Sequence, residues 1–289
     1  MPPVCYTVWM NGKISLIIPD LHHRWGQAEK IISNVGADEV IFLGDYFDDF
    51  NDTPEMVRET CEWLEASVKK PNRIHLFGNH DVHYAFTYRT FQCSGYEQWK
   101  YFIIHDTLPR EVWDKLVWYH LLDDQWLLTH AGLHKHNLPD SIKKLRTDRP
   151  KFIAAIKDHL DHSIKEGFKA AANNVGHWCF NAGLARWGMQ KVGGITWCDF
   201  EREFFPIKGL NQILGHTPQM QEPRWCVLDK DPLNSDGQVG YRPSDLYTPT
   251  LKQLSDSELS HNIDLDVHGN THYGIWDGKK FTIGNYRDL

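Results

Sequence analysis

Apolar runs that each end in a polar cluster recur along this chain, and they restrict its fold more than any other feature. The polar residues that end the runs are Asp20 and His22 in "KISLIIPDLHH", Asp45 in "EVIFLGDYFDD", Asn79 and His80 in "NRIHLFGNHD", His130 in "QWLLTHAGL" and His216 in "NQILGHTPQ". Each run has the length and residue types of a buried strand. In sheets flanked by helices, residues just past the strand ends carry the chemistry.

Segments with helical spacing separate the first three runs. They read "WGQAEKIISNVG" and "TPEMVRETCEWLEASVKK", and the second begins with Thr53 as a helix N-cap and Pro54 at the first helical position. Strands that alternate with helices predict an α/β fold with a layered core.

The rest of the chain is expected to complete one domain spanning residues 1–289. Residues 117–129 predict a hairpin that turns at Asp123 and Asp124, and residues 134–195 predict a helical insertion or cap. Residues 229–260, rich in Pro, Ser and Asp, predict a long surface loop. The C-terminal run from His261 to Tyr286 alternates as antiparallel strands do, with one turn at Gly269 and Asn270 and another at Asp277 and Gly278.

The composition excludes several classes of protein. A net charge of −7 gives no support to binding of bulk nucleic acid, although small phosphorylated ligands remain compatible with it. No window has the length of a membrane span, and residues 1–13 lack the basic flank and apolar run of a signal peptide. The six cysteines include no CxxC pair, so we expect reduced thiols and a cytoplasmic location.

Asp45, Asp48 and Asp49 crowd together directly after a buried strand, which costs free energy unless a positive charge lies among them. Asp20 and His22 are two positions apart, so both side chains can leave one face of a strand end. A carboxylate beside an imidazole can bind a divalent transition metal. The strand ends therefore predict a metal site, with His23 pointing away as a structural residue.

Five motifs in this order resemble the calcineurin-like metallophosphoesterases. They are D-x-H in "PDLHH", G-D-x-x-D in "GDYFDD", "GNHD", "THAG" and "GHTP", and they span residues 20–218. The "THAGL" and "GHTP" segments are most similar to the bacterial and phage phosphoprotein-phosphatase branch, which includes serine/threonine phosphatases and diadenosine-tetraphosphate hydrolases.

The resemblance implies a four-layer α/β/β/α sandwich that binds two divalent metal ions, with Mn²⁺ expected and Fe or Zn as alternatives. It assigns the first metal to Asp20, His22 and Asp45, and the second to Asp45, Asn79, His130 and His216. His80 would be the general acid and Asp48 would orient it. The implied reaction is attack of a metal-bound hydroxide on a phosphomonoester, a nucleotide or a phosphoprotein.

The sequence departs from the family pattern after the second motif. Asp49 stands where phosphoprotein phosphatases usually have a phosphate-binding arginine, so monoester or diester preference is left open. Arg186, Arg202 and Asp199 are the candidates for substrate contacts. The alternatives are a phosphodiesterase or nuclease acting at the same site, and a non-catalytic scaffold, although no ligand residue is missing.

Overall fold

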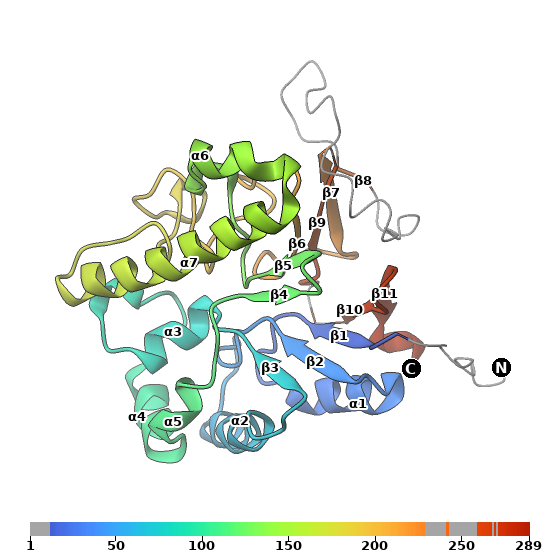
Figure 1. Cartoon of the computed structure of the whole chain (residues 1–289). Helices are drawn as coiled ribbons and strands as arrows, with labels where there is room; N and C mark the ends of the chain where they lie inside the picture. The colour runs from blue at the N-terminus through green and yellow to red at the C-terminus, as the bar shows by residue number, and fades with distance from the viewer. Residues whose placement is uncertain (1–11, 229–240, 243–258, 268, 270) are drawn as a thin grey trace.

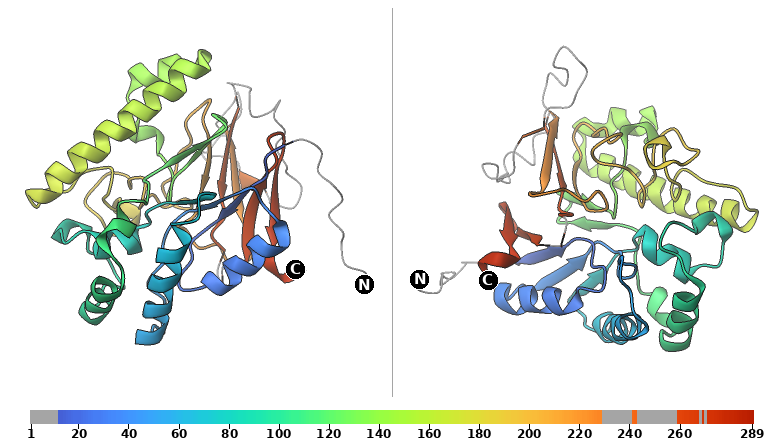
Figure 2. Two further views of the ribbon diagram at one scale, coloured as in Figure 1. Left: turned by 60° about the horizontal axis from the view of Figure 1, so that its bottom comes forward. Right: turned by 180° about the vertical axis from the view of Figure 1, so that it is seen from behind.

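Two β-sheets packed face to face form the centre of the molecule, and helices cover the outer faces (Figure 1). The computed structural model describes residues 12–228, 241–242, 259–267, 269 and 271–289. The order of layers is helix, sheet, sheet, helix, as the views in Figure 2 also show. The predicted four-layer α/β/β/α fold is therefore confirmed.

The first sheet has five strands in the order β11-β10-β1-β2-β3. Their bounds are β1 Ser15–Ile18, β2 Glu39–Phe42, β3 Arg73–His75, β10 His272–Trp276 and β11 Phe281–Asn285. β1, β2 and β3 are parallel, whereas β10 and β11 add an antiparallel hairpin at the edge beyond β1. The parallel arrangement brings the carboxyl ends of β1, β2 and β3 to one edge.

The second sheet has six strands in the order β4-β5-β6-β9-β7-β8. Their bounds are β4 His120–Leu122, β5 Trp126–Leu128, β6 Asn211–Leu214, β7 Arg224–Leu228, β8 Tyr241–Arg242 and β9 Ser260–Asp264. β5, β6 and β9 are parallel, so the carboxyl ends of β5 and β6 also lie at one edge. β4 and β5 form the hairpin predicted for residues 117–129, with positive φ at both Asp123 and Asp124.

The helices follow the strand–helix alternation predicted for the first half of the chain. Their bounds are α1 Trp25–Val35, α2 Pro54–Ser67, α3 Asn79–Ala85, α4 Gln98–Thr107, α5 Arg110–Trp113, α6 Asp140–Lys143 and α7 Arg149–Ala172, with short 3₁₀ turns η1 Arg89–Phe91, η2 Lys135–Asn137, η3 Lys144–Thr147, η4 Leu184–Arg186 and η6 Tyr286–Asp288. The Thr53 side chain caps α2 by accepting a hydrogen bond from the Met56 N–H at 3.3 Å.

Apolar side chains from both sheets fill the space between them. Ile17 and Ile41 from the first sheet pack in one cluster with Trp126, Ile213 and Ile263 from the second. A second cluster lies between the first sheet and the helices, where α1 and α2 bury their apolar faces. Because β1 and β2 are covered on both faces, their runs are almost continuously apolar, as parallel central strands usually are.

The structure corrects two expectations about the second half. The helical pattern of residues 134–195 ends at Ala172, and the only helical turn described between there and residue 195 is η4. After α7 the chain turns at Asn174, whose φ is 55°. The segment that follows is packed too closely for a helix at Gly194, where a Cβ would collide with the carbonyl oxygens of Trp178 and Cys179. The C-terminal run is not one antiparallel unit, since β9 is in the second sheet and β10 in the first.

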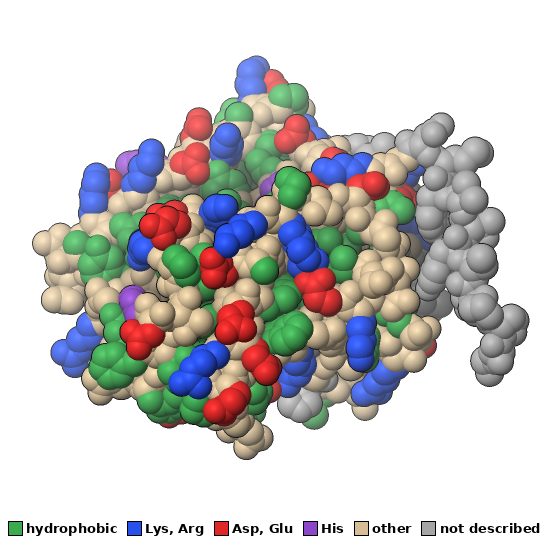
Figure 3. Space-filling model, turned by 90° about the horizontal axis from the view of Figure 1, so that it is seen from below, with side chains coloured by type: hydrophobic (Ala, Val, Ile, Leu, Met, Phe, Trp, Pro, Cys, Tyr) green, Lys and Arg blue, Asp and Glu red, His purple; other side chains and the backbone are tan. Residues whose placement is uncertain are grey.

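The predicted surface loop at residues 229–260 lies outside the described residues, apart from β8, Leu259 and Ser260, and the predicted turn at Gly269 and Asn270 lies partly outside them. Among the described helices, none is long and apolar enough to cross a membrane. On the face seen in Figure 3, basic and acidic side chains are interspersed. Elsewhere in the described residues, acidic and basic side chains also pair at the surface, as Lys69 and Glu65 do at 2.6 Å.

Candidate dinuclear metal centre

Polar residues from five strand ends meet between the two sheets. In the first sheet, Asp20 and His22 follow β1, Asp45 and Asp48 follow β2, and Asn79 and His80 follow β3. In the second sheet, His130 follows β5 and His216 follows β6. The His22 N–H donates to the Asp45 carbonyl at 2.7 Å, and the Gly215 N–H donates to the His130 carbonyl at 2.7 Å. These backbone bonds hold neighbouring loops together at the site.

Several of these residues have left-handed backbone conformations. The φ angles are 51° at Asp45, 66° at Asp48, 42° at His22 and 73° at His216. Residues other than glycine rarely adopt the left-handed backbone region, although Asp and His do so more often than most. Such conformations are concentrated at functional sites, where the surrounding contacts hold them in place.

The first group of ligand atoms comes from Asp20, His22 and Asp45, whose donor atoms all lie within 4.8 Å of one another. His22 Nε2 is 3.9 Å from Asp45 Oδ2. The other ring nitrogen, Nδ1, donates to the Phe47 carbonyl at 3.1 Å. In the neutral ring this bond places the proton on Nδ1 and leaves the Nε2 lone pair toward the carboxylates, which is the tautomer that a metal ligand needs.

The second group surrounds His130, which is fully buried. Its Nε2 lies 3.0 Å from Asn79 Oδ1, 3.2 Å from His216 Nδ1 and 3.3 Å from Asp45 Oδ2. Its Nδ1 donates to the Leu43 carbonyl at 3.0 Å. The two groups share Asp45, as the sequence resemblance implied.

The charges around His130 favour a cation at the centre of this group. Burial opposes the charged imidazole, but Asp45 and Asp20 raise the pKa of His130 to about 9. Because Nδ1 already donates to Leu43, the second proton of the charged ring lies on Nε2. There it faces the Asn79 oxygen, the His216 nitrogen and the Asp45 oxygen, each of which can accept a hydrogen bond or bind a metal ion. A divalent ion would replace that proton with more charge and with the oxygen and nitrogen ligands that Mn, Fe and Zn prefer.

The carboxylates of this centre are held by backbone N–H groups. Asp20 accepts from the His216 N–H at 3.0 Å, and Asp45 Oδ1 accepts from the His80 N–H at 2.9 Å. Burial would raise the pKa of Asp45, but His130 and His80 hold it well below its usual range. Asp45 is therefore ionised and has its Oδ2 atom left to face both groups.

Asp81, the last residue of the "GNHD" motif, fastens two of the loops to each other. Its Oδ2 accepts from the N–H groups of Asp45 at 2.7 Å and Gly78 at 2.8 Å, and its Oδ1 accepts from the Tyr46 N–H at 2.8 Å. Burial and the nearby Asp45 charge raise the pKa of Asp81 to about 7, while these backbone donors oppose that rise. Asp81 thus determines where Asp45 lies relative to Asn79.

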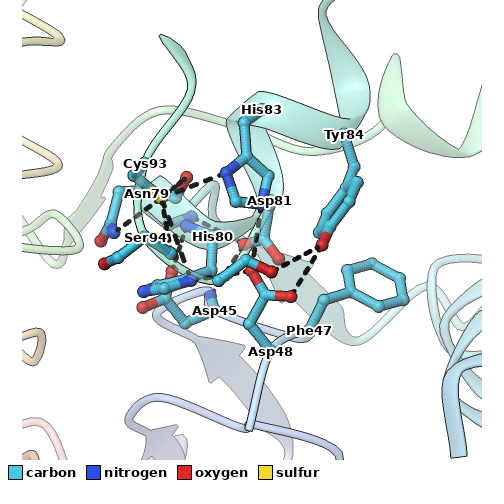
Figure 4. A network of polar contacts seen from close by, with 12 residues as sticks. Asp45, Phe47, Asp48, Asn79, His80, Asp81, His83, Tyr84, Cys93 and Ser94 are labelled. Atoms are coloured by element: carbon cyan, nitrogen blue, oxygen red, sulfur yellow. Dashed lines mark hydrogen bonds and ion pairs between the residues drawn. The ribbon is translucent and has the colours of Figure 1, made fainter. Parts of the chain in front are cut away.

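His80 and Asp48 form a hydrogen-bonded pair beside the metal ligands (Figure 4). The distance from His80 Nδ1 to Asp48 Oδ2 is 2.9 Å, and the His80 side chain is 21% exposed. Although burial disfavours the charged ring, Asp45 and Asp48 raise the pKa of His80 well above its usual value. The pair has the composition and geometry of an oriented general acid.

Three further residues hold Asp48, and the sequence interpretation missed them. His83 Nε2 lies 3.0 Å from Asp48 Oδ2, while Tyr84 Oη donates to Oδ1 at 2.8 Å and buried Lys100 Nζ lies 2.9 Å from Oδ1. Tyr84 and the ring of His83 are visible in Figure 4. Proximity of His83 to the "GNHD" motif was a signal, but Lys100 comes from α4, for which no motif exists.

The predicted structural role of His23 fits its surroundings. The ring is buried, with Nδ1 2.8 Å from Thr60 Oγ1 and Nε2 3.2 Å from Asp52 Oδ1. Asp52 also pairs with Lys100, so His23 and Asp48 belong to one buried polar network. This network connects α2 and α4 to the loop that carries Asp48.

The candidate substrate-binding residues differ in position. Arg186 Nε lies 2.7 Å from Asp199 Oδ2, and Arg186 Nη2 donates to the His216 carbonyl at 3.4 Å, so both residues lie beside the centre. Arg202 is exposed, and its backbone N–H donates to Asp199 Oδ1 at 2.8 Å. The structure brings Arg186 and Asp199 to the site but gives Arg202 no described side-chain contact there.

Asp49, which occupies the position of the missing arginine, forms an ion pair with an arginine from another loop. Its Oδ2 lies 3.0 Å from Arg24 Nη2, and both side chains are partly exposed. Arg24 directly follows the D-x-H motif, so a guanidinium is present near this position although it comes from another loop. The negative charge of Asp49 is therefore partly neutralised.

Several solved structures match this chain at low sequence identity and with TM-scores below 0.5. A metallophosphoesterase from Sphaerobacter thermophilus has a TM-score of 0.45 at 16% identity, with 96% of this chain and 90% of that chain covered. A putative diadenosine tetraphosphatase has a TM-score of 0.44 at 12% identity, with 96% of both chains covered. A protein serine/threonine phosphatase from Saccharomyces cerevisiae has a TM-score of 0.28 at 15% sequence identity, with 43% of this chain and 39% of that chain covered.

The family of the chain is shown by the sequence comparison alone. No curated protein matches the chain. The profile of the calcineurin-like phosphoesterase family, however, matches residues 15–220, a range that contains all five strand ends and both groups of candidate metal ligands. The chain therefore belongs to the calcineurin-like phosphoesterase family and is a metal-dependent phosphoester hydrolase.

Proposed function

We propose that this protein hydrolyses phosphomonoesters, of a small molecule, a nucleotide or a phosphoprotein, at a centre of two divalent metal ions. The observation that carries the proposal is the position of Asp45, which belongs to both groups of ligand atoms. Asp20 and His22 would complete the first site, and Asn79, His130 and His216 the second. We expect Mn²⁺ in both, with Fe or Zn as alternatives.

When bound, the two ions would clamp the phosphoryl group and supply a nucleophile at neutral pH. The chain's own contribution is the proton. His80 Nδ1 is bonded to Asp48, so Nε2 carries the proton that the leaving oxygen would receive. Arg186, held by Asp199, would add a positive charge beside the phosphate.

We further propose that residues 134–195 form a cap within a single domain of residues 1–289. Support comes from Arg186, which belongs to this segment and contacts the loop of His216. A cytoplasmic location stays a prediction from the sequence.

The proposal is tested by the variant Asp45→Asn. Loss of the shared carboxylate should remove most bound metal and nearly all turnover of an aryl phosphate with added Mn²⁺, with the fold retained. Asp38→Asn is the matched control, because Asp38 directly precedes the amino end of the same strand and its carboxylate accepts the exposed Ile14 N–H at 2.8 Å, far from the ligand atoms.

Two metals per chain and normal turnover in Asp45→Asn would refute the dinuclear assignment. Aryl monoesters and diesters should be compared in the same assay. A clear preference for diesters would replace the proposed monoesterase with the phosphodiesterase alternative. Absence of turnover on both, with the metals bound, would favour a scaffold.

A further inference from the structure

A third group of metal-binding side chains lies next to the dinuclear centre. It consists of His80, His83 and Cys93, and one donor atom from each lies within 4.8 Å of the others. His80 and His83 come from α3, whereas Cys93 follows the 3₁₀ turn η1 (Figure 4). The cysteine sulfur is 3.1 Å from His83 Nδ1 and 4.0 Å from His80 Nδ1.

These distances bracket the spacing of zinc ligands. Zn–S bonds of about 2.3 Å and Zn–N bonds of about 2.0 Å place sulfur and nitrogen about 3.5 Å apart around a tetrahedral ion. The two observed separations lie on either side of that value, so small side-chain rotations would suffice. Asp48 Oδ2, 2.9 Å from His80 Nδ1, is an oxygen within reach of the fourth position.

The loop that carries Cys93 is fixed against the catalytic pair. Gly95 has φ of 95°, and a Cβ there would come within 2.9 Å of Asp48 Oδ2. The Gly95 carbonyl also accepts hydrogen bonds from Tyr84 Oη at 3.3 Å and Lys100 Nζ at 3.1 Å. The sulfur is therefore held in position beside the two imidazoles and does not depend on a loose loop.

We propose that Cys93, His83 and His80 bind a zinc ion at a site separate from the dinuclear centre, and that this ion inhibits the enzyme. The ligand chemistry distinguishes the two sites. A thiolate with imidazoles prefers Zn²⁺, whereas carboxylate, amide and imidazole ligands also accept Mn²⁺. His83 is buried, but Cys93 and His80 are partly exposed, so an ion from solvent can reach them.

Zinc at this site would remove the general acid. Coordination through His80 Nδ1 displaces the proton shared with Asp48, and the thiol proton is released to solvent as well. The ring is then a neutral ligand whose remaining Nε2 proton is far less acidic than that of an imidazolium. The inhibitory part rests on the proposed role of His80, but binding of zinc does not.

The binding test uses cobalt as a spectroscopic probe. Co²⁺ added to the Mn²⁺-loaded protein should give a thiolate-to-cobalt charge-transfer band in the near ultraviolet, because the dinuclear centre contains no sulfur ligand. Cys93→Ser should abolish the band and should retain one zinc fewer per chain after equilibration with Zn²⁺. Ser94→Ala, on the same loop, is the matched control and should behave as the wild type does.

The inhibition test measures turnover as Zn²⁺ is added to the Mn²⁺-loaded protein. Alkyl phosphates should lose about 10²-fold in rate, as expected for loss of a general acid, and nitrophenyl phosphate less. Cys93→Ser should resist this inhibition.

No cobalt band in the wild type, or the same band in Cys93→Ser, overturns the zinc site. A Cys93-dependent band with unchanged turnover upholds the site and refutes its inhibitory effect, together with the role of His80 as acid. If the wild type, Cys93→Ser and Ser94→Ala all lack turnover before zinc is added, the result refutes the proposed phosphatase function and not the zinc site.

Discussion

Asp81 provides the sharpest test of how the site is built, because it touches no substrate and yet holds the loop of Asp45. The variant Asp81→Asn keeps the shape of the side chain and replaces one acceptor oxygen with an NH₂ group. Oδ2 accepts two backbone N–H groups and Oδ1 accepts one. The amide oxygen can keep the pair from Asp45 and Gly78, which leaves the Tyr46 N–H facing another donor.

The expected cost follows from these three bonds. A buried N–H without an acceptor costs about 1–3 kcal/mol, and the two remaining bonds weaken because their acceptor is no longer charged. We expect the free energy of unfolding of the metal-free protein to fall by about 2–4 kcal/mol. Displacement of Asp45 should also weaken metal binding by about 10–100-fold, the usual effect of changing a residue that orients a ligand.

Urea unfolding of the metal-free protein and titration with Mn²⁺ measure the two effects, at pH 8 so that the wild-type carboxyl is ionised. Asp277→Asn is the matched control. Its Oδ1 alone accepts both the Lys279 N–H at 2.8 Å and the Lys280 N–H at 2.7 Å, so an amide oxygen keeps both. The control should change stability by less than about 0.5 kcal/mol. Unchanged metal affinity in Asp81→Asn would refute the positioning role.

Two other variants test the catalytic pair and its support. His80→Ala should slow alkyl phosphates by about 10²-fold or more but nitrophenyl phosphate less, because a good leaving group needs little protonation; equal losses in a leaving-group series would contradict the acid role. Lys100→Met should lower the free energy of unfolding by about 3 kcal/mol, because it removes the ammonium shared by the buried carboxylates of Asp48 and Asp52 and leaves them only their imidazole and hydroxyl partners. Denaturation that matches the wild type would show that the ammonium is not what neutralises them.

The candidate metal ligands could be predicted from the sequence because each follows a recognisable strand. Parallel strands place their carboxyl ends at one edge, so Asp20, Asp45 and Asn79 had to meet once β1, β2 and β3 were identified. His130 and His216 follow from the same rule in the second sheet. The positions of these side chains thus depend on strand periodicity, which a sequence displays directly.

The support of Asp48 could not be predicted in the same way. Lys100 reaches Asp48 from α4, and Cys93 reaches its partner His83 from the loop after η1. The sequence shows no periodic feature that relates those segments to β2. Arg24 meets Asp49 for a similar reason, across two loops. Contacts of this kind depend on tertiary packing, so neither spacing nor residue type reveals them.

The division of the C-terminal strands also required the structure. β9 and β10 both alternate in sequence, and alternation shows which face of a strand is buried but not which sheet it joins. β9 pairs with β6 in parallel, so it extends the second sheet instead of forming a hairpin with β10. The result places buried Asp264 and Asp266 at the carboxyl end of β9, close to the site.

The backbone of the site explains why its geometry depends on residues that bind no metal. A left-handed conformation at a residue other than glycine costs on the order of 1–3 kcal/mol, and Asp45, Asp48 and His216 all adopt it. Local sequence preference therefore does not fix these turns, and tertiary contacts must. Asp81 accepts two backbone N–H groups at the turn of Asp45 and a third from Gly78, and the side chain of Lys100 supports that of Asp48. The ligand geometry is thus set by buried polar groups outside the ligand set, and substitutions there should disturb metal binding without removing a ligand.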